Sequence, residues 1–154
     1  MARHLWSLLC EKTVIEAGTQ SLSIINVYED IQAKVVVPDG AIIPEDPKVP
    51  LALTVVSVWE RSNLNVEEEK ESFRIRIVDP NGKELGINEQ VFSMTGPHFR
   101  ARAILNIPGM PVSVSGRYLF EVQGRKGKRW NVETQLPLTV NISVGHQPKP
   151  GKPS

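Results

Sequence analysis

Cysteine, alanine and long apolar runs are scarce in this sequence of 154 residues. The one cysteine, Cys10, excludes a disulfide within the chain and favours a reducing compartment, so we expect a cytoplasmic protein. There is no run of about 18 apolar residues, so we expect no membrane span. Only 7 alanines stand against 30 valines and isoleucines, a ratio that favours strands over helices.

Motifs for catalysis and for metal or phosphate binding are also absent. His4, His98 and His146 lie at no ligand spacing from one another or from Cys10. The acidic residues between 67 and 71 lack the glycine and the spaced oxygen ligands of a calcium loop. No nucleophile elbow or phosphate loop occurs. We therefore expect no enzymatic activity, no metal, no cofactor and no small-molecule substrate.

Instead, apolar and polar residues alternate with period two along most of the chain. The segment Phe73-Arg74-Ile75-Arg76-Ile77 is the clearest half-buried strand, and residues 4–15 and 51–60 follow the same pattern. About eight such strands predict an all-β domain over residues 1–144, built as a two-sheet β-sandwich. A closed barrel is the alternative. Residues 145–154, rich in proline and lysine, predict a disordered tail.

Prolines and two-sided apolar patterns predict how the strands are connected. Residues 21–29 are apolar on both faces, which indicates an interior strand, and Lys34 to Val37 extend it past a bend. The proline-bearing stretch 41–50 is expected to connect the two sheets. Residues 108–111 are expected to break the chain, and Pro137 marks an edge or a switch between sheets.

Local patterns give three further expectations. Asp79-Pro80-Asn81-Gly82 matches a type I turn that closes a hairpin. Residues 61–72 carry four glutamates without an apolar period, which predicts a solvated loop. Residues 99–107 place Phe99 and the small Ala101 and Ala103 inward, so a bulky group from the opposite sheet is expected over the alanines, with Trp59 as the candidate.

The segment from Gly116 to Val122 resembles the late strand of immunoglobulin-like domains. There a tyrosine, here Tyr118, caps a corner through its hydroxyl, and Phe120 stands where immunoglobulins carry a cysteine. The strand ending in Val58-Trp59 is similar to the one that carries the core tryptophan. Both disulfide cysteines are missing, and the stretch before Trp59 is longer than usual. The turns at 79–82 and 108–111, taken with this strand, also resemble macroglobulin-like modules.

Over its full length, and especially at residues 10–16 and 21–29, the chain resembles an uncharacterised family of small bacterial proteins. The resemblance implies a sandwich fold and supplies no activity.

Charge is distributed unevenly along the chain. Residues 11–95 hold 15 acidic and 8 basic residues, whereas residues 96–129 hold 7 basic residues and one acidic residue. In a sandwich these charges neutralise each other across neighbouring strands, or the basic part forms a separate binding face.

Two functions are consistent with these features. Apolar side chains opposite the core faces, at Val56, Val58, Ile104 and Leu119, predict a protein-interaction or assembly module that binds a protein partner or a second copy. The alternative is nucleic-acid or other polyanion binding through a basic hairpin tip beside Trp130. Trp130 could instead face the core above a merely soluble tip. The residues expected to contact a partner are Arg100, Arg102, Arg117, Arg125, Lys126, Lys128 and Arg129.

Overall fold

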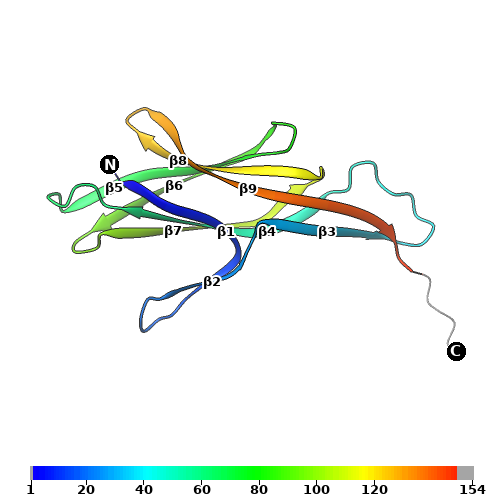
Figure 1. The fold of residues 1–154 in the computed structure, drawn as a ribbon, viewed down its shortest axis with the longest axis horizontal. Coiled ribbons are helices and arrows are strands. Elements are labelled where there is room, and N and C mark those ends of the chain that lie inside the picture. Colours follow the sequence, from blue (N-terminus) through cyan, green and yellow to red (C-terminus); the bar gives the residue numbers. More distant parts are fainter. Residues whose placement is uncertain (1, 149–154) are drawn as a thin grey trace.

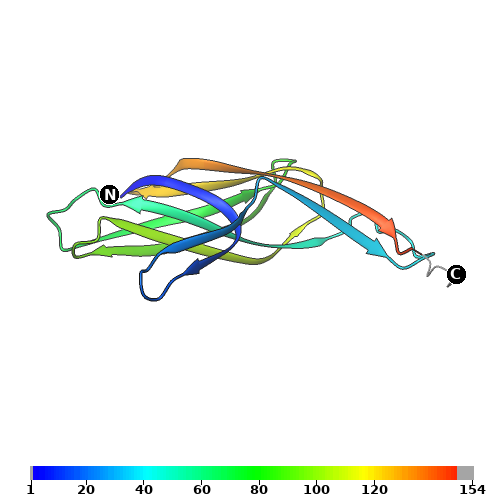
Figure 2. The same ribbon diagram turned by 60° about the horizontal axis from the view of Figure 1, so that its bottom comes forward.

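The computed structural model describes residues 2–148 and contains two packed β-sheets, with no helix among those residues (Figures 1 and 2). The all-β sandwich is confirmed, with nine strands instead of about eight. The strands are β1 (Arg3–Ile15), β2 (Leu22–Val27), β3 (Asp30–Val37), β4 (Val49–Glu60), β5 (Glu68–Val78), β6 (Glu84–Thr95), β7 (Arg100–Val112), β8 (Gly116–Lys126) and β9 (Arg129–His146). Sheet A has the order β2-β1-β4-β7, and sheet B has the order β3-β9-β8-β5-β6.

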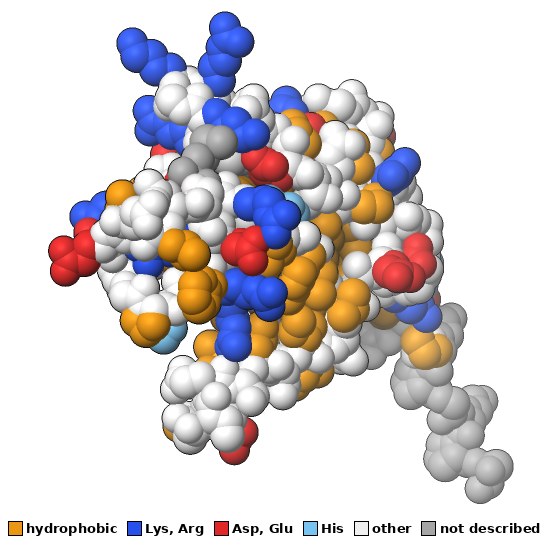
Figure 3. All heavy atoms as spheres, turned by 60° about the vertical axis from the view of Figure 1, so that its left-hand side comes forward, with side chains coloured by type: hydrophobic (Ala, Val, Ile, Leu, Met, Phe, Trp, Pro, Cys, Tyr) orange, Lys and Arg blue, Asp and Glu red, His pale blue; other side chains and the backbone are white. Residues whose placement is uncertain are grey.

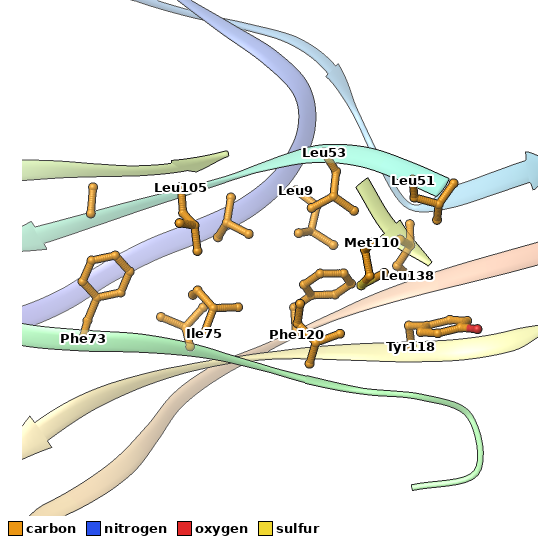
Figure 4. Packing of buried hydrophobic residues seen from close by; sticks show 14 of the residues in the cluster. Leu9, Leu51, Leu53, Phe73, Ile75, Leu105, Met110, Tyr118, Phe120 and Leu138 are labelled. Carbon is orange, nitrogen blue, oxygen red and sulfur yellow. The ribbon is translucent and has the colours of Figure 1, made fainter. Parts of the chain in front are cut away.

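The core lies between the inner faces of the two sheets. Successive side chains of a strand point to opposite faces, so the period-two pattern places alternate apolar residues in one layer. Figure 4 shows Leu9, Leu53 and Leu105 of sheet A facing Phe73 and Phe120 of sheet B. Burying a side chain of this size contributes about 1.5–3 kcal/mol. The inward positions predicted for β4, β5 and β8 are confirmed: Leu51, Leu53, Val55, Trp59, Phe73, Ile75, Ile77, Tyr118, Phe120 and Val122.

The predicted turn between β5 and β6 is present. The Asp79 carboxylate accepts hydrogen bonds from the amides of Asn81 (2.9 Å) and Lys83 (2.8 Å), and the Gly82 amide donates to the Asp79 carbonyl (3.0 Å). Gly82 has a φ of 83°, which a residue without a Cβ adopts at no steric cost. The corner that the resemblance implied is also present, because the Tyr118 hydroxyl donates to the Val114 carbonyl (2.7 Å).

The chain changes sheets at Tyr28 and Glu29. The Tyr28 amide donates to the Leu9 carbonyl of sheet A (2.8 Å), and one residue later the Glu29 carbonyl accepts from Thr139 of sheet B (3.0 Å). The expectation of an interior strand at residues 21–29 is therefore wrong, since β2 is an edge strand. Residues 34–37 do not extend it, because they belong to β3, which pairs in parallel with β9.

The two proline positions have different outcomes. β9 continues through Pro137 without leaving sheet B, so no switch occurs there, but Pro137 does lie at a local edge of the sheet, the other alternative expected for it. Pro137 is tolerated because β3 pairs with β9 only from Thr139 onward, which leaves Pro137 without a neighbour on that side. Residues 108–111 do not break the chain, since β7 passes through them with a register shift opposite Leu51 and Leu53. A connection between the two sheets is present as expected, but it covers residues 38–48, since Val49 and Pro50 already belong to β4.

Trp59 does not come from the opposite sheet. It lies in β4, directly beside Ala101 of β7 in sheet A. Its ring instead packs against Phe73 and Phe92 of sheet B, with centroids 6.0 and 5.7 Å away. Phe99, which was expected to point inward, precedes β7 and is 58% exposed. An inward position alone does not tell which sheet supplies the side chain above it.

The acidic segment 61–72 is not simply a solvated loop. β5 begins at Glu68, and both Arg61 and Glu69 are buried. The Glu69 carboxylate accepts hydrogen bonds from the Ser62 hydroxyl (2.8 Å) and the Asn63 amide (3.2 Å). The Arg61 guanidinium donates to the carbonyls of Asn63 (3.1 Å), Gly96 (2.8 Å) and Val66. The pair ties the loop before β5 to Gly96, which follows the end of β6.

The last strand is longer than expected. β9 includes Gly145 and His146, which pair with Val36 and Val37, so the sheet extends past residue 144. The rest of the expected tail, residues 149–154, lies outside the described residues. In Figures 1 and 2, β3 and the end of β9 extend together beyond the body of the two sheets. Between residues 2 and 148 the structure has no helix that could cross a membrane.

Candidate functional site

The seven predicted contact residues do not form one surface. Arg125, Lys126, Lys128 and Arg129 surround the turn between β8 and β9, and we call these four the basic tip. Arg100 and Arg102 lie on β7, on the outer face of sheet A. Arg117 is the second residue of β8 and lines a separate hollow with Tyr28, Asp30 and Pro137. At about 3.3 Å per residue along β8, Arg117 lies some 26 Å from Arg125 of the tip. It also lies in sheet B, whereas Arg100 and Arg102 lie in sheet A, so it belongs to neither group.

The basic tip is a tight two-residue turn. Lys126 and Arg129 pair and close the turn. Gly127, at the first turn position, has a φ of 62°, a conformation that favours glycine there. The Arg125 Nε donates to the Gly127 carbonyl (3.0 Å). All four cations of the tip are exposed, and none forms an ion pair with a described carboxylate. The tip therefore presents four closely spaced positive charges to solvent.

Trp130 lies beside the tip on the outer face of sheet B, not in the core. The guanidinium carbons of Arg74 and Arg125 lie 4.6 and 5.9 Å from its ring centroid. Such cation–π contacts hold both side chains over the ring. The Arg74 Nε also donates to Gln123 Oε1 (2.6 Å). The part of the ring that these two cations cover is not available for stacking with a nucleic-acid base.

A hollow of about 530 Å³ lies on the outer face of sheet A. It is lined by Trp6 of β1, Leu22 and Ile24 of β2, Val58 of β4, and Arg100 and Arg102 of β7, and we call it the sheet A groove. Trp6 is 41% exposed. Figure 3 shows hydrophobic side chains gathered on this side of the molecule with basic side chains along their border. A hollow of this size is in the range of small ligand sites.

The β1–β2 hairpin forms one wall of the groove. Arg102 Nη1 donates to the Gln20 carbonyl in the hairpin turn (2.8 Å), which ties the turn to β7 across 82 residues of sequence. Val56 and Val58, expected to be exposed, are buried on this outer face, with exposed fractions of 0% and 6%. Ile104 and Leu119 are only partly exposed. The apolar surface offered to a partner therefore comes mainly from Trp6 and the hairpin.

Arg100 forms no ion pair with the acidic residue opposite it in the neighbouring strand. Glu60 of β4 lies directly opposite Arg100, yet the Glu60 carboxylate pairs with Arg3. No described carboxylate pairs with Arg100 or Arg102. A neighbouring hollow, which shares Arg100 with the groove, is lined by Glu60, Pro97, His98, Phe99 and Arg100. Two cations without counter-charges thus lie next to exposed aromatic surface.

Groups that could carry chemistry are held in structural roles. Cys10 is fully buried, and burial raises the pKa of its thiol, which disfavours the reactive thiolate. Burial lowers the pKa of His4, whose Nε2 lies 2.8 Å from the Ser7 hydroxyl. That hydroxyl donates in turn to Ser57 (2.8 Å). Within the described part of the chain, no group of three or more histidine, cysteine, aspartate or glutamate side chains could hold a metal ion.

Sequence reasoning missed Trp6 and Arg74 as members of these surfaces. The alternation did place Trp6, Leu8 and Cys10 on one side of the first strand. No sequence pattern indicated that residues of β2 would line the same hollow as Trp6. Searches for matching protein-family models and for similar curated proteins find no match to this chain.

Proposed function

We propose that this domain is a non-enzymatic binding module that recognises an acidic segment of a protein partner in the sheet A groove. The observation that carries the proposal is the position of Arg100 and Arg102, which have no described counter-charge, beside the half-exposed Trp6. The partner segment would carry one or two carboxylates next to a large apolar side chain.

The chemistry of the groove favours this occupant. Guanidinium groups bind carboxylates through two parallel hydrogen bonds, which are stronger than neutral ones. Tryptophan and arginine are also the residues that dominate the binding energy of protein interfaces. An apolar side chain on Trp6 and Ile24 would displace water that the hollow holds poorly. Charge sets the orientation of the segment, and apolar contact supplies most of the affinity.

Selection from a displayed library of random peptides tests the proposal. We expect recovered peptides to be enriched in aspartate and glutamate beside leucine or aromatic residues. Arg100→Glu and Trp6→Ala should each weaken binding of the consensus peptide at least about tenfold, since each removes a central contact. Arg117→Glu is the matched control, because it makes the same charge change outside the groove. Peptides without acidic residues, or equal losses in Arg100→Glu and Arg117→Glu, would contradict the proposal.

A second candidate function is polyanion binding at the basic tip. It rests on four exposed cations together with Arg74 and Arg125 held over Trp130. Phosphate or sulfate groups would replace the counterions of the tip, so affinity should fall steeply with salt. Fluorescence anisotropy with a single-stranded oligonucleotide and with heparin at low salt tests it. Neutral glutamines at the four tip positions should abolish the signal, whereas Arg100→Gln should not change it.

We also infer an immunoglobulin-like arrangement of the strands and a cytoplasmic location. The Tyr118 hydroxyl bond and the central burial of Phe120 support the first, and the single buried thiol of Cys10 supports the second. An experimental structure whose strands superpose in order on an immunoglobulin domain, and fractionation of the host cell, are the respective checks.

A further inference from the structure

β3 is an edge strand, and no strand of the described residues 2–148 is hydrogen-bonded to its outer side. The Glu29 carbonyl accepts a hydrogen bond from the Thr139 amide (3.0 Å), and the Val37 carbonyl accepts one from the Gln147 amide (2.7 Å). The donor and the acceptor are the same number of residues apart in both bonds. Backbone groups alternate in direction along a strand, and a parallel ladder is evenly spaced. The odd residues of β3 therefore bond to β9, and the even residues direct their N–H and C=O groups outward. These even residues are Asp30, Gln32, Lys34 and Val36, and all four are exposed.

Each of the other three edge strands has a backbone irregularity, a proline or a short length that hinders pairing, and β3 has none of these. β7 has Pro108 and Pro111 and a register shift. β6 pairs through a register shift near its start, and β2 is six residues long with Asn26 at a φ of 52°. Prolines, shifts, short length and charged side chains are the usual protections of an edge, and of these β3 carries only the charges of Asp30 and Lys34. β3 has eight residues in continuous register, without proline or glycine, and it projects beyond the sandwich (Figure 1).

The charges of β3 are complementary to themselves. In an antiparallel pair of two β3 strands centred on Gln32, Asp30 of each copy lies opposite Lys34 of the other. Side chains directly opposite have Cβ atoms about 5 Å apart, within reach of an ion pair. Neither Asp30 nor Lys34 forms an ion pair with another described residue. A dimer with its two-fold axis at Gln32 would thus contain both ion pairs and about six backbone hydrogen bonds between the two β3 strands.

We propose that β3 pairs with β3 of a second copy of this chain, joining the two B sheets into one continuous sheet across a two-fold axis. The self-complementary charges identify a second copy as the occupant, because a partner of unrelated sequence would not require the Asp30 and Lys34 spacing. The proposal is independent of the sheet A groove, which lies on a different sheet.

Sedimentation equilibrium of the full chain over a concentration series tests the pairing. We expect a monomer–dimer equilibrium for the unmodified protein. Asp30→Lys and Lys34→Asp each place like charges opposite one another twice, so each should raise the dimer dissociation constant about tenfold or more. The double variant restores opposite charges and should return the constant to near its original value. A monomeric unmodified protein, or a double variant that dimerises no better than the single ones, would overturn the proposal.

Gln32→Pro provides a second test that leaves the monomer intact. The Gln32 amide points outward, so its loss removes no hydrogen bond to β9, and Ile31 before it is already extended. We expect this variant to be monomeric with an unchanged far-ultraviolet circular dichroism spectrum. Gln32→Thr keeps the amide and is the control, which should still dimerise. A Gln32→Pro protein that dimerises as well as Gln32→Thr would show that another surface mediates association.

Discussion

Gly124 of β8 lies directly under the indole of Trp59. A Cβ at Gly124 would be 3.1 Å from Cη2 of Trp59 and 3.0 Å from Oε1 of Glu133. Trp59 is 3% exposed and has His4, Phe73 and Phe92 around its ring. The ring has little room to move away, so a side chain at Gly124 would overpack this contact between sheet A and sheet B.

Gly124→Ala is therefore expected to lower the free energy of unfolding by about 1–3 kcal/mol, as other overpacked cores do. Urea denaturation followed by tryptophan fluorescence measures the change. Gly86→Ala is the control, because a Cβ at Gly86 of β6 would meet no atom within 4 Å. A Gly124→Ala protein as stable as the control would show that the Trp59 ring is less confined than described.

The hydrogen-bonded carboxylate of Glu69 predicts a loss of stability in acid. Burial opposes ionisation of Glu69, whereas hydrogen bonds, among them those from Ser62 and the Asn63 amide, favour it, and the net effect lowers its pKa from 4.5 to about 2. The folded pKa lies below the unfolded one, so the stabilisation is complete above pH 4.5 and disappears as the pH falls towards 2. Urea denaturation at a series of pH values should show this decline, and Glu69→Gln should flatten it.

Removing the Arg61 side chain should destabilise the fold strongly. Arg61→Ala removes a buried cation 4.0 Å from the Glu69 carboxylate and leaves three carbonyl groups without their donor, so we expect a loss of about 3–5 kcal/mol at neutral pH. Lys70→Ala breaks only the exposed pair with Glu68 and should cost under about 1 kcal/mol. Equal effects of the two variants would contradict a structural role for the buried pair.

Tyr118→Phe removes one defined hydrogen bond without changing the core volume. The lost bond to the Val114 carbonyl should lower the free energy of unfolding by about 1 kcal/mol. Tyr28→Phe removes a hydroxyl for which no hydrogen bond is found among the described residues, and it should be nearly neutral. Thermal denaturation of both variants in parallel checks the difference, and a Tyr118→Phe protein as stable as Tyr28→Phe would rule out a stabilising corner.

Sequence patterns predicted what depends on near neighbours. The alternation at Phe73, Ile75 and Ile77 and the turn at Asp79 are set by a few adjacent residues, and both are confirmed. The sheet crossing at Tyr28 and Glu29 was not predicted, because period two fixes which face a side chain takes and not which sheet its strand joins. For the same reason Trp59 was expected in the sheet opposite Ala101, whereas it lies in the same sheet.

The candidate site was predicted in part. Arg100 and Arg102 are on the outer face, as their even positions in the alternation indicated. The groove itself depends on contacts between residues far apart, such as the hydrogen bond between Arg102 and Gln20. No local pattern reports that Glu60 pairs with Arg3 and leaves Arg100 without a counter-charge. Those pairings follow from the order β2-β1-β4-β7, which composition and spacing do not determine.

The three tryptophans allow the most direct test of the proposed function. Trp6 lies in the sheet A groove, Trp130 beside the basic tip and Trp59 in the core, so their indole N–H signals in a nitrogen–proton correlation spectrum report three separate places. Titration with the consensus acidic peptide should shift the Trp6 signal and leave those of Trp130 and Trp59 unchanged. A peptide that shifts Trp130 and not Trp6 would contradict recognition in the sheet A groove.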